Sequence, residues 1–488
     1  MDDLDTPLPE FDLSPAEMRR LAALAASIAS EHRERLDERP VFGKVGPRAG
    51  ALDLPLPRRG ATADEVLAFV RETVMPYPMG NSHARFFGFI NATADPLGAL
   101  ADYLGATLNP NCWGGDHAAV HVEHRVMRWI AEIIGLPADA DGILASGGSM
   151  ANFVCLAAAR RGMAAGNVRE DGVGRDGAPR LVVYASEQVH SCVDKAVDLL
   201  GLGTRDLRKI PVDDAFRLSV PSLEAQIAAD RAAGLRPAIV VGTAGTVNTG
   251  AIDPLEALAD LCARERLWFH VDGAYGGMAA ISPTLRPLLR GIERADSVAA
   301  DPHKWLYVPY EAGAALVTRK GVLGDTFRRF PEYLASDPES PFPGPAWFAE
   351  RGPELSRSFK ALKVFMGLLR HGTEGYARAV ERDVALARAL ADEVDHRPAL
   401  ERVAPQVLSI VNFRYRPAGV TAAEDVDRVN RRIVHRLTRD GLFFLAPTIL
   451  RGRASIRVAI TNFRTTRKDL VALCDAVEQV GAEMAVES

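Results

Sequence analysis

Short, almost wholly apolar runs recur through the middle of the chain, and helical stretches separate several of them. Residues 254–265 are one such stretch. Near-continuous apolar strands that alternate with helices are typical of a mostly parallel sheet covered by helices on both faces. Ligands of such sheets bind beyond the carboxyl ends of the strands, so we expect the chemistry just after these runs. The runs are 181–184, 238–241, 267–271, 297–299 and 314–317.

Two flanking regions differ from this α/β middle. The first 95 residues read as helices joined by Pro-rich loops, with a helix-capping signal at Ser14–Glu17. From about residue 376, strand patterns with one covered face indicate a small α+β unit. We therefore predict an N-terminal helical segment 1–95, a large cofactor-binding domain 96–375 and a small C-terminal α+β domain 376–488.

Composition and charge indicate which partners and which compartment to expect. The 488 residues carry 58 Lys and Arg against 63 Asp and Glu, a net charge of −5, and 48% of them are hydrophobic. This balance gives no reason to expect a nucleic acid or a membrane as a partner. Five cysteines without a CxxC pair indicate reduced thiols, and the acidic start Met1–Asp5 differs from a signal peptide. We therefore expect a cytoplasmic protein.

Lysine is scarce in this chain, and Lys304 has unusual surroundings. It follows a strand-like run in the motif Asp301-Pro302-His303-Lys304-Trp305. Small and aromatic neighbours disfavour the charged ammonium, which frees the amine to form an imine with an aldehyde. A lysine that reaches from a strand end into solvent is the alternative.

Three further features follow other strand-like runs. Asp272 ends one run, and a carboxylate there can hold a metal, a ribose hydroxyl or a protonated ring nitrogen. The small residues 145–149 open a helix whose free N–H groups suit a phosphate, although a plain loop-to-helix junction has the same pattern. His190 can stack on a ring or transfer protons, or it can be purely structural.

These four features favour one cofactor when they are taken together. A phosphate, a pyridine nitrogen and an aldehyde all need partners in pyridoxal 5′-phosphate (PLP). An aspartate beside the pyridinium nitrogen and a lysine Schiff base are its expected contacts. We therefore predict that the chain binds PLP.

The lysine motif at 301–305, together with His-Val-Asp-Gly-Ala-Tyr-Gly-Gly at 270–277, resembles the group II pyridoxal-dependent amino-acid decarboxylases. This family includes the aromatic-L-amino-acid and glutamate decarboxylases. The resemblance implies the type I (aspartate aminotransferase-like) α/β fold, with a mostly parallel sheet, helices on both faces and a small C-terminal α+β domain. It also implies PLP-dependent decarboxylation of an aromatic or other hydrophobic L-amino acid to the amine and CO₂, in a homodimer with active sites at the subunit interface.

The resemblance implies roles for individual residues. Lys304 is then the Schiff-base lysine, Asp272 the partner of the pyridine nitrogen and His190 the residue stacked on the ring. Phe330–Leu334 resembles a mobile loop whose Tyr333 reaches the partner subunit's site and donates a proton to Cα with the help of the histidine. The other cofactor contacts that it implies are Gly148, Ser149, Thr246, Ala274 and His303.

Some positions depart from the family pattern. Asp301 stands where the family often has Asn. Asn91, Asn109 and Asn111 stand where aromatic-specific members have more apolar side chains. Other outcomes on the same fold therefore stay open, namely oxidative deamination to an aldehyde, β-elimination, transamination, or decarboxylation of glutamate or another polar amino acid.

A histidine cluster offers a competing interpretation. His117, His121 and His124 would share one face of a helix, where Glu123 could add a carboxylate to a metal site. Because the HExxH order is absent, we predict no metal and interpret the cluster as an exposed or interface helix face.

Overall fold

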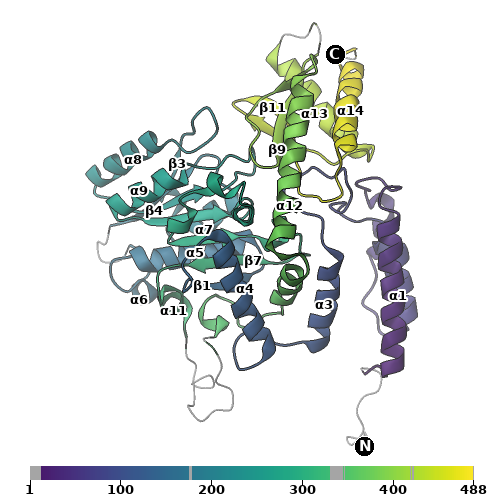
Figure 1. Ribbon diagram of the computed structural model, residues 1–488, viewed down its shortest axis with the longest axis horizontal. Helices are drawn as coiled ribbons and strands as arrows, with labels where there is room; N and C mark the ends of the chain where they lie inside the picture. Colours follow the sequence, from purple (N-terminus) through teal and green to yellow (C-terminus); the bar gives the residue numbers. More distant parts are fainter. Residues whose placement is uncertain are drawn as a thin grey trace, which may run out of the picture.

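The computed structural model describes residues 12–174, 179–329, 345, 347–417, 419 and 422–486. Its centre is a seven-stranded sheet in the order β1-β7-β6-β5-β4-β2-β3 (Figure 1). β7 pairs antiparallel with both of its neighbours, whereas the remaining pairs are parallel, which confirms the predicted sheet. Each predicted run falls on one of these strands. The strands are β1 (Asp141–Ala145), β2 (Leu181–Ser186), β3 (Leu207–Ile210), β4 (Arg236–Thr243), β5 (Trp268–Gly273), β6 (Ser297–Ala300) and β7 (Gly313–Val317).

Helices cover both faces of this sheet. A Cβ atom built on Gly162 of α5 would lie 2.7 Å from the Trp268 ring, and one built on Gly242 would lie 3.2 Å from Phe269 and 3.0 Å from Leu255 of α9. Because successive residues of a strand point to opposite faces, α5 and α9 lie on opposite sides of β5. The helices of this unit are α4 (Ala118–Ile134), α5 (Gly148–Met163), α6 (Val168–Asp171), α7 (Ser191–Leu199), α8 (Val220–Ala232), α9 (Leu255–Glu265), α10 (Pro302–Trp305) and α11 (Val322–Phe327).

A long helix joins the large unit to a smaller C-terminal one (Figure 1). This helix, α12 (Ala361–Asp395), kinks at Gly372, whose φ is 61°. The predicted boundary at 375/376 falls inside it, so the limits of the domains stay a prediction. The smaller unit is an antiparallel sheet in the order β10-β11-β9-β8, with its own apolar core. Its elements are β8 (Leu400–Arg402), β9 (Ile410–Tyr415), α13 (Ala423–Arg439), β10 (Ala446–Leu450), β11 (Arg453–Ala459) and α14 (Arg467–Val486).

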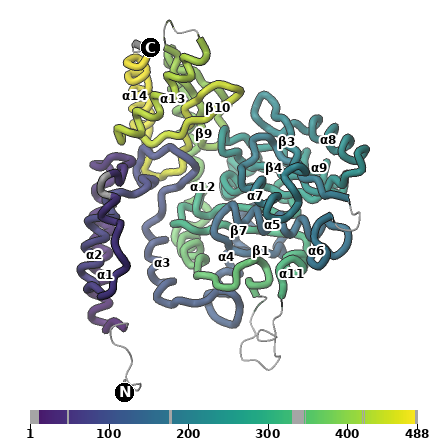
Figure 2. Tube along the Cα trace, turned by 180° about the vertical axis from the view of Figure 1, so that it is seen from behind, coloured from purple at the N-terminus to yellow at the C-terminus, as the bar shows by residue number. Residues whose placement is uncertain are grey.

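The N-terminal helices stand to one side of the molecule, next to α3 (Figure 2). They are α1 (Pro15–Glu34) and α2 (Ala63–Phe69), whereas α3 is Pro96–Leu108. The chain between α2 and α3 reaches the C-terminal unit, since the Phe87 N–H donates to the Phe444 carbonyl over 2.8 Å. Within the described part of the chain, no helix combines the length and the apolar character of a membrane span.

A buried ion pair fastens α4 to the end of β1. The guanidinium of Arg357 lies 2.5 Å from the carboxylate of Glu123, and both side chains are at most 1% exposed. Arg357 also donates to the Leu144 carbonyl over 2.7 Å, while the Leu144 N–H donates to Glu123 over 3.1 Å. These contacts hold the carboxyl end of β1, where the loop into α5 begins.

Replacing Glu123 with Gln is expected to lower the free energy of unfolding by about 3–5 kcal/mol, because the Arg357 charge is left buried without its counter-ion. Urea denaturation followed by circular dichroism measures this loss. The matched control is Glu374→Gln, since the Glu374 side chain is 93% exposed. An equal, small effect of both substitutions would show that the buried pair does not stabilise the fold.

Candidate active site

A cavity of about 600 Å³ lies at the carboxyl end of the large sheet. It is lined by residues at or just after the ends of β1, β2, β4, β5 and β6, by residues 89–91 and by residues of the C-terminal unit. Most of the predicted site residues share this cavity. Those that line it are Gly148, Ser149, His190, Asp272, Ala274, His303 and Lys304.

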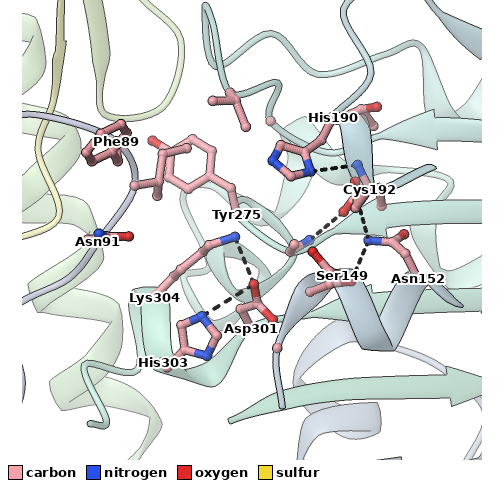
Figure 3. Close-up of a pocket in the computed structure, with 18 of the residues that line it drawn as sticks. Phe89, Asn91, Ser149, Asn152, His190, Cys192, Tyr275, Asp301, His303 and Lys304 are labelled. Atoms are coloured by element: carbon pink, nitrogen blue, oxygen red, sulfur yellow. Dashed lines mark hydrogen bonds and ion pairs between the residues drawn. The ribbon is translucent and has the colours of Figure 1, made fainter. Parts of the chain in front are cut away.

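Lys304 lies on α10, the short helix that follows β6. Its Nζ is 2.8 Å from Oδ2 of Asp301, and the two side chains are 17% and 2% exposed. Figure 3 shows the lysine and the aspartate pointing toward each other at the floor of the cavity. The sheet thus presents one primary amine to the cavity and pairs it with a buried carboxylate.

Asp272 is the penultimate residue of β5, and it is 5% exposed. Its Oδ1 accepts the Ala274 N–H over 3.2 Å. Two residues earlier on the same strand, His270 contacts Asn152 Oδ1 at 2.7 Å and Ser297 Oγ at 2.9 Å. Burial lowers the pKa of His270 to about 4, so this ring is neutral at pH 7. Asp272 is therefore the carboxylate at this end of β5, and the neutral, hydrogen-bonded His270 lies behind it.

The predicted phosphate cradle is the amino end of α5. The first N–H groups of a helix have no partner inside the helix, and they present a positive dipole end. A Cβ atom on Gly148 would lie 2.7 Å from Asp301 Oδ2 and 2.9 Å from the Ala274 Cβ. The close approach of these two side chains therefore requires a glycine at this position.

His190 caps α7, and its ring faces the cavity (Figure 3). Nδ1 accepts the Cys192 N–H over 3.2 Å, so the proton of the neutral imidazole is on Nε2. The capping bond fixes the ring at the mouth of the cavity, where it can cover a planar ligand.

His303 is held from two sides. Its Nδ1 accepts the Ala312 N–H over 3.2 Å, and its Nε2 lies 3.6 Å from Asp301 Oδ2. The ring also packs on Tyr310, with 4.4 Å between ring centroids. Burial lowers the pKa of His303, so the ring is neutral at pH 7.

Sequence reasoning missed Arg457, the charged residue that β11 brings to the cavity. It is 3% exposed, and it donates to the backbone oxygens of Val247 over 2.5 Å and Phe89 over 3.3 Å. Its Nη2 is buried and has no partner among the described residues. Burial lowers the pKa of Arg457 to about 10, so the group is charged at neutral pH. A guanidinium with an unused donor is suited to a carboxylate.

The structure places several predicted residues away from the cavity. Thr246 does not line it, and its hydroxyl contacts that of Thr249 at 2.9 Å. Thr243, at the end of β4, lines the cavity in its place and has a buried, unpaired hydroxyl within the described chain. Tyr333 and the rest of Phe330–Leu334 lie outside the described residues.

Of the three asparagines that depart from the family pattern, Asn91 alone lines the cavity, where it accepts the Tyr310 hydroxyl over 2.9 Å. Asn109 ends α3 in a left-handed conformation, and Asn111 accepts the Arg357 N–H over 2.9 Å. The backbone of Asn109 and the amide oxygen of Asn111 therefore have structural roles in this chain.

Two of the three histidines of this cluster, His121 and His124, have other partners. His121 pairs with Asp116 at 2.7 Å, and the His124 ring packs on Phe348 with 4.5 Å between centroids. Glu123 forms the buried ion pair with Arg357. The described residues contain no group of three His, Cys, Asp or Glu side chains that could hold a metal.

Asp383 of α12 accepts hydrogen bonds from two residues that follow Lys304. Its Oδ2 accepts the Trp305 indole N–H over 3.1 Å and the Tyr307 hydroxyl over 2.7 Å. The carboxyl is fully buried, and desolvation raises its pKa to about 7. Since the unfolded chain releases this proton near pH 4, the folded state binds one more proton between pH 4 and 7.

The free energy of unfolding is therefore expected to fall as the pH rises through this window, by on the order of 1.4 kcal/mol for each pH unit. Urea denaturation at pH 5 and pH 7.5 measures the effect. Asp383→Asn is expected to show a smaller decrease, whereas the fully exposed control Asp214→Asn is expected to match the parent protein. An unchanged pH dependence in Asp383→Asn would exclude this carboxyl as its source.

The donor set fits PLP. The cavity offers one amine for the aldehyde, one carboxylate at the end of β5 for the ring nitrogen, and a glycine-lined helix end for the phosphate. Three residues of its lining each have one buried polar atom that has no partner within the described residues. These atoms are Thr243 Oγ1, Asp301 Oδ1 and Arg457 Nη2.

Comparisons with known proteins agree with this fit. The pyridoxal-dependent decarboxylase conserved domain matches residues 48–416. An aromatic-L-amino-acid decarboxylase of Bacillus atrophaeus is 33% identical over 98% of this chain and 98% of its own length. An acidic amino acid decarboxylase of Homo sapiens is 30% identical over 89% of this chain and 84% of its own length. A crystal structure of Oryza sativa TDC with PLP and tryptamine superposes with a TM-score of 0.89 at 28% identity, over 98% of this chain and 100% of that one.

Proposed function

Since the chain belongs to the pyridoxal-dependent decarboxylase family and is a PLP-dependent amino-acid decarboxylase, we propose that its substrate is an aromatic L-amino acid. The observation that carries this proposal is the shortage of cations in the cavity. Of the described lysines and arginines, Lys304 and Arg457 line it. Lys304 is assigned to the cofactor, so one guanidinium remains for the substrate's α-carboxylate.

An acidic substrate needs a second cation for its side-chain carboxylate, and the described lining supplies none from lysine or arginine. The lining includes apolar side chains instead, namely Phe89, Ile90, Val247 and Pro447. Such a surface stabilises an aromatic ring by burying it. The aromatic-L-amino-acid decarboxylase and the TDC–tryptamine complex among the similar proteins support the same substrate class.

The site residues then have the following roles. Lys304 would hold the cofactor through its amine, and the amino end of α5 with Gly148 and Ser149 would hold the phosphate together with His303. Asp272 would keep a proton on the ring nitrogen, with Ala274 and His190 packing on opposite faces of the ring. When bound, the cofactor supplies an electron sink for the bonding pair that remains as CO₂ leaves.

The protein's own groups direct the reaction. Arg457 binds and orients the α-carboxylate, while the apolar lining excludes water and so strengthens the interaction between Asp272 and the ring nitrogen. His190 carries its proton on Nε2 and can assist a proton transfer to Cα, for which Tyr333 is the proposed donor.

A substrate panel tests this function. The PLP-loaded protein is given each aromatic L-amino acid, histidine, glutamate and aspartate, and CO₂ and amine are both measured. The best aromatic substrate is expected to exceed glutamate and aspartate by at least about 100-fold in kcat/KM, since a buried unpaired carboxylate costs several kcal/mol. Faster turnover of an acidic amino acid would contradict the proposal.

The amine rather than the aldehyde is the expected product, because Tyr333 is present. Tyr333→Phe is expected to slow protonation at Cα, so that O₂ competes and gives the aldehyde, ammonia and H₂O₂ along with CO₂. The ratio of aldehyde to amine, measured by chromatography, is expected to rise at least about tenfold. An unchanged amine yield would remove the tyrosine from its proposed role.

We also propose a cytoplasmic homodimer with active sites at the subunit interface. The five cysteines are buried and unpaired, which supports a reducing compartment. An apolar face of α3 supports a contact with a second copy, since its side chains are between 44% and 69% exposed. They are Leu100, Tyr103, Leu104 and Leu108. Sedimentation velocity is expected to show a dimer that Leu104→Arg dissociates, and a monomeric parent protein would contradict this.

A further inference from the structure

Asp301 is a buried carboxylate with an unused oxygen. It occupies the cap position of α10, yet its side chain makes no capping bond. Oδ2 faces Lys304 Nζ at 2.8 Å, whereas Oδ1 is buried without a partner among the described residues. A buried carboxylate oxygen with no donor is costly, so the residue is poised for a change of partner or of charge.

The same carboxylate lies against the amino end of α5. Asp301 Oδ2 is 2.7 Å from where a Cβ on Gly148 would stand, so it occupies the rim of the proposed phosphate cradle. A phosphate in that cradle brings a second anion beside it. Two anions that share a low-dielectric site do not both stay ionised without a counter-ion, and one of them binds a proton. Meanwhile the existing counter-ion, the Lys304 ammonium, is lost when the amine bonds to the cofactor.

The other titratable groups that face Asp301 are poor acceptors for this proton. His303 already uses Nδ1 to accept the Ala312 N–H, and a proton there would break that bond. Burial raises the pKa of Tyr310 and of Cys192, so both stay neutral and have no negative charge to protonate. Asp272, across the cavity, is reserved as the ionised partner of the ring nitrogen.

We propose that Asp301 takes up a proton when the cofactor binds and changes from the counter-ion of Lys304 to a hydrogen-bond donor toward the phosphate. In this exchange the Lys304 ammonium gives one proton to Asp301, and its nitrogen bonds to the aldehyde carbon. The aldehyde oxygen leaves as water with the other two protons, so atoms and charge balance. The inference rests on the proposed roles of Lys304 and the α5 end. It explains how this chain uses an aspartate where an amide side chain is common among the proteins that it resembles.

Infrared difference spectroscopy of the full chain, before and after addition of PLP, tests the proposal. The parent protein is expected to gain the C=O stretching band of a protonated carboxylic acid, equivalent to about one group per chain. The band is expected to shift in D₂O and on labelling of aspartate with ¹³C at the side-chain carboxyl. Asp301→Asn is expected to lack the band, and Asp214→Asn, altered at a fully exposed position, is expected to keep it.

The isotope-labelling experiment uses the parent protein. It therefore shows whether an aspartate takes up the proton even if Asp301→Asn does not fold. A PLP-loaded parent protein without the band, or a band that persists in folded Asp301→Asn, would overturn the proposal. Visible absorbance reports separately whether PLP has bound. If the parent protein shows no visible absorbance from bound PLP, the proposed roles of Lys304 and the α5 end are contradicted, and this inference with them.

Discussion

Replacing Lys304 with Ala is expected to lower kcat for decarboxylation by at least about a thousandfold. The variant loses the amine that would hold the cofactor in position relative to Asp272 and the amino end of α5. Lys304 has no substitute within the cavity, since the other described cation from lysine or arginine is a guanidinium. Initial rates of CO₂ release, measured with saturating PLP, report the loss. Lys320→Ala is the matched control, because the Lys320 side chain is 79% exposed and pairs with Asp139 on the surface.

Retention of more than about a tenth of the parental rate by Lys304→Ala would show that another group holds the cofactor. The variant also tests folding independently, because its circular dichroism and its urea midpoint can be compared with those of the control. The Asp301 carboxylate is left without its cation in this variant. Some loss of stability is therefore expected, but it does not account for lost activity in protein that remains folded.

Removing the charge of Asp272 is expected to lower kcat by about a thousandfold or more, because a neutral ring nitrogen is a much weaker electron sink. Asp272→Asn keeps the volume of the side chain and an acceptor for the Ala274 N–H. Asp272→Ala removes both. Similar losses in the two variants would identify the charge, rather than the shape, as the cause.

PLP content, measured by absorbance, separates a chemical effect from loss of the cofactor. Variants that keep PLP but turn over slowly would support the assigned role. The exposed control Asp214→Asn is expected to have the parental rate. Near-normal turnover by Asp272→Asn would refute the assignment of this carboxylate to the ring nitrogen.

The large sheet could be predicted well because most of its strands are short, apolar and buried on both faces. Within that sheet, the exceptions were β1 and β3. β3 (Leu207–Ile210) is an edge strand with two polar residues, so it lacks a continuous apolar run. β1 contains a glycine and begins with Asp141, and its pairing with β7 depends on contacts that are remote in sequence.

Site residues that share one motif were also accessible from the sequence. Lys304, His303 and Asp301 belong to the single motif 301–305, and the structure brings them to one cavity with Asp272. Arg457 was missed because the C-terminal unit supplies it, and only tertiary packing carries β11 to the cavity.

Two threonines at and after the end of β4 show a finer limit of sequence reasoning. Resemblance favoured Thr246, but Thr243 ends the strand in register with Asp272 on the neighbouring strand. Gly245 and Val247 line the cavity on either side of Thr246, whose hydroxyl contacts that of Thr249 instead. The local conformation after β4, where the φ of Gly245 is +94°, is not apparent from the sequence.

The most direct test of the account is reduction of the PLP-loaded full chain with borohydride, followed by digestion and mass spectrometry of the peptides. The account predicts a pyridoxyl group on Lys304 in the parent protein, at close to one per chain, and none at this position in Lys304→Ala. A pyridoxyl group that maps to a different lysine, or a parent protein that gives no labelled peptide, would contradict it.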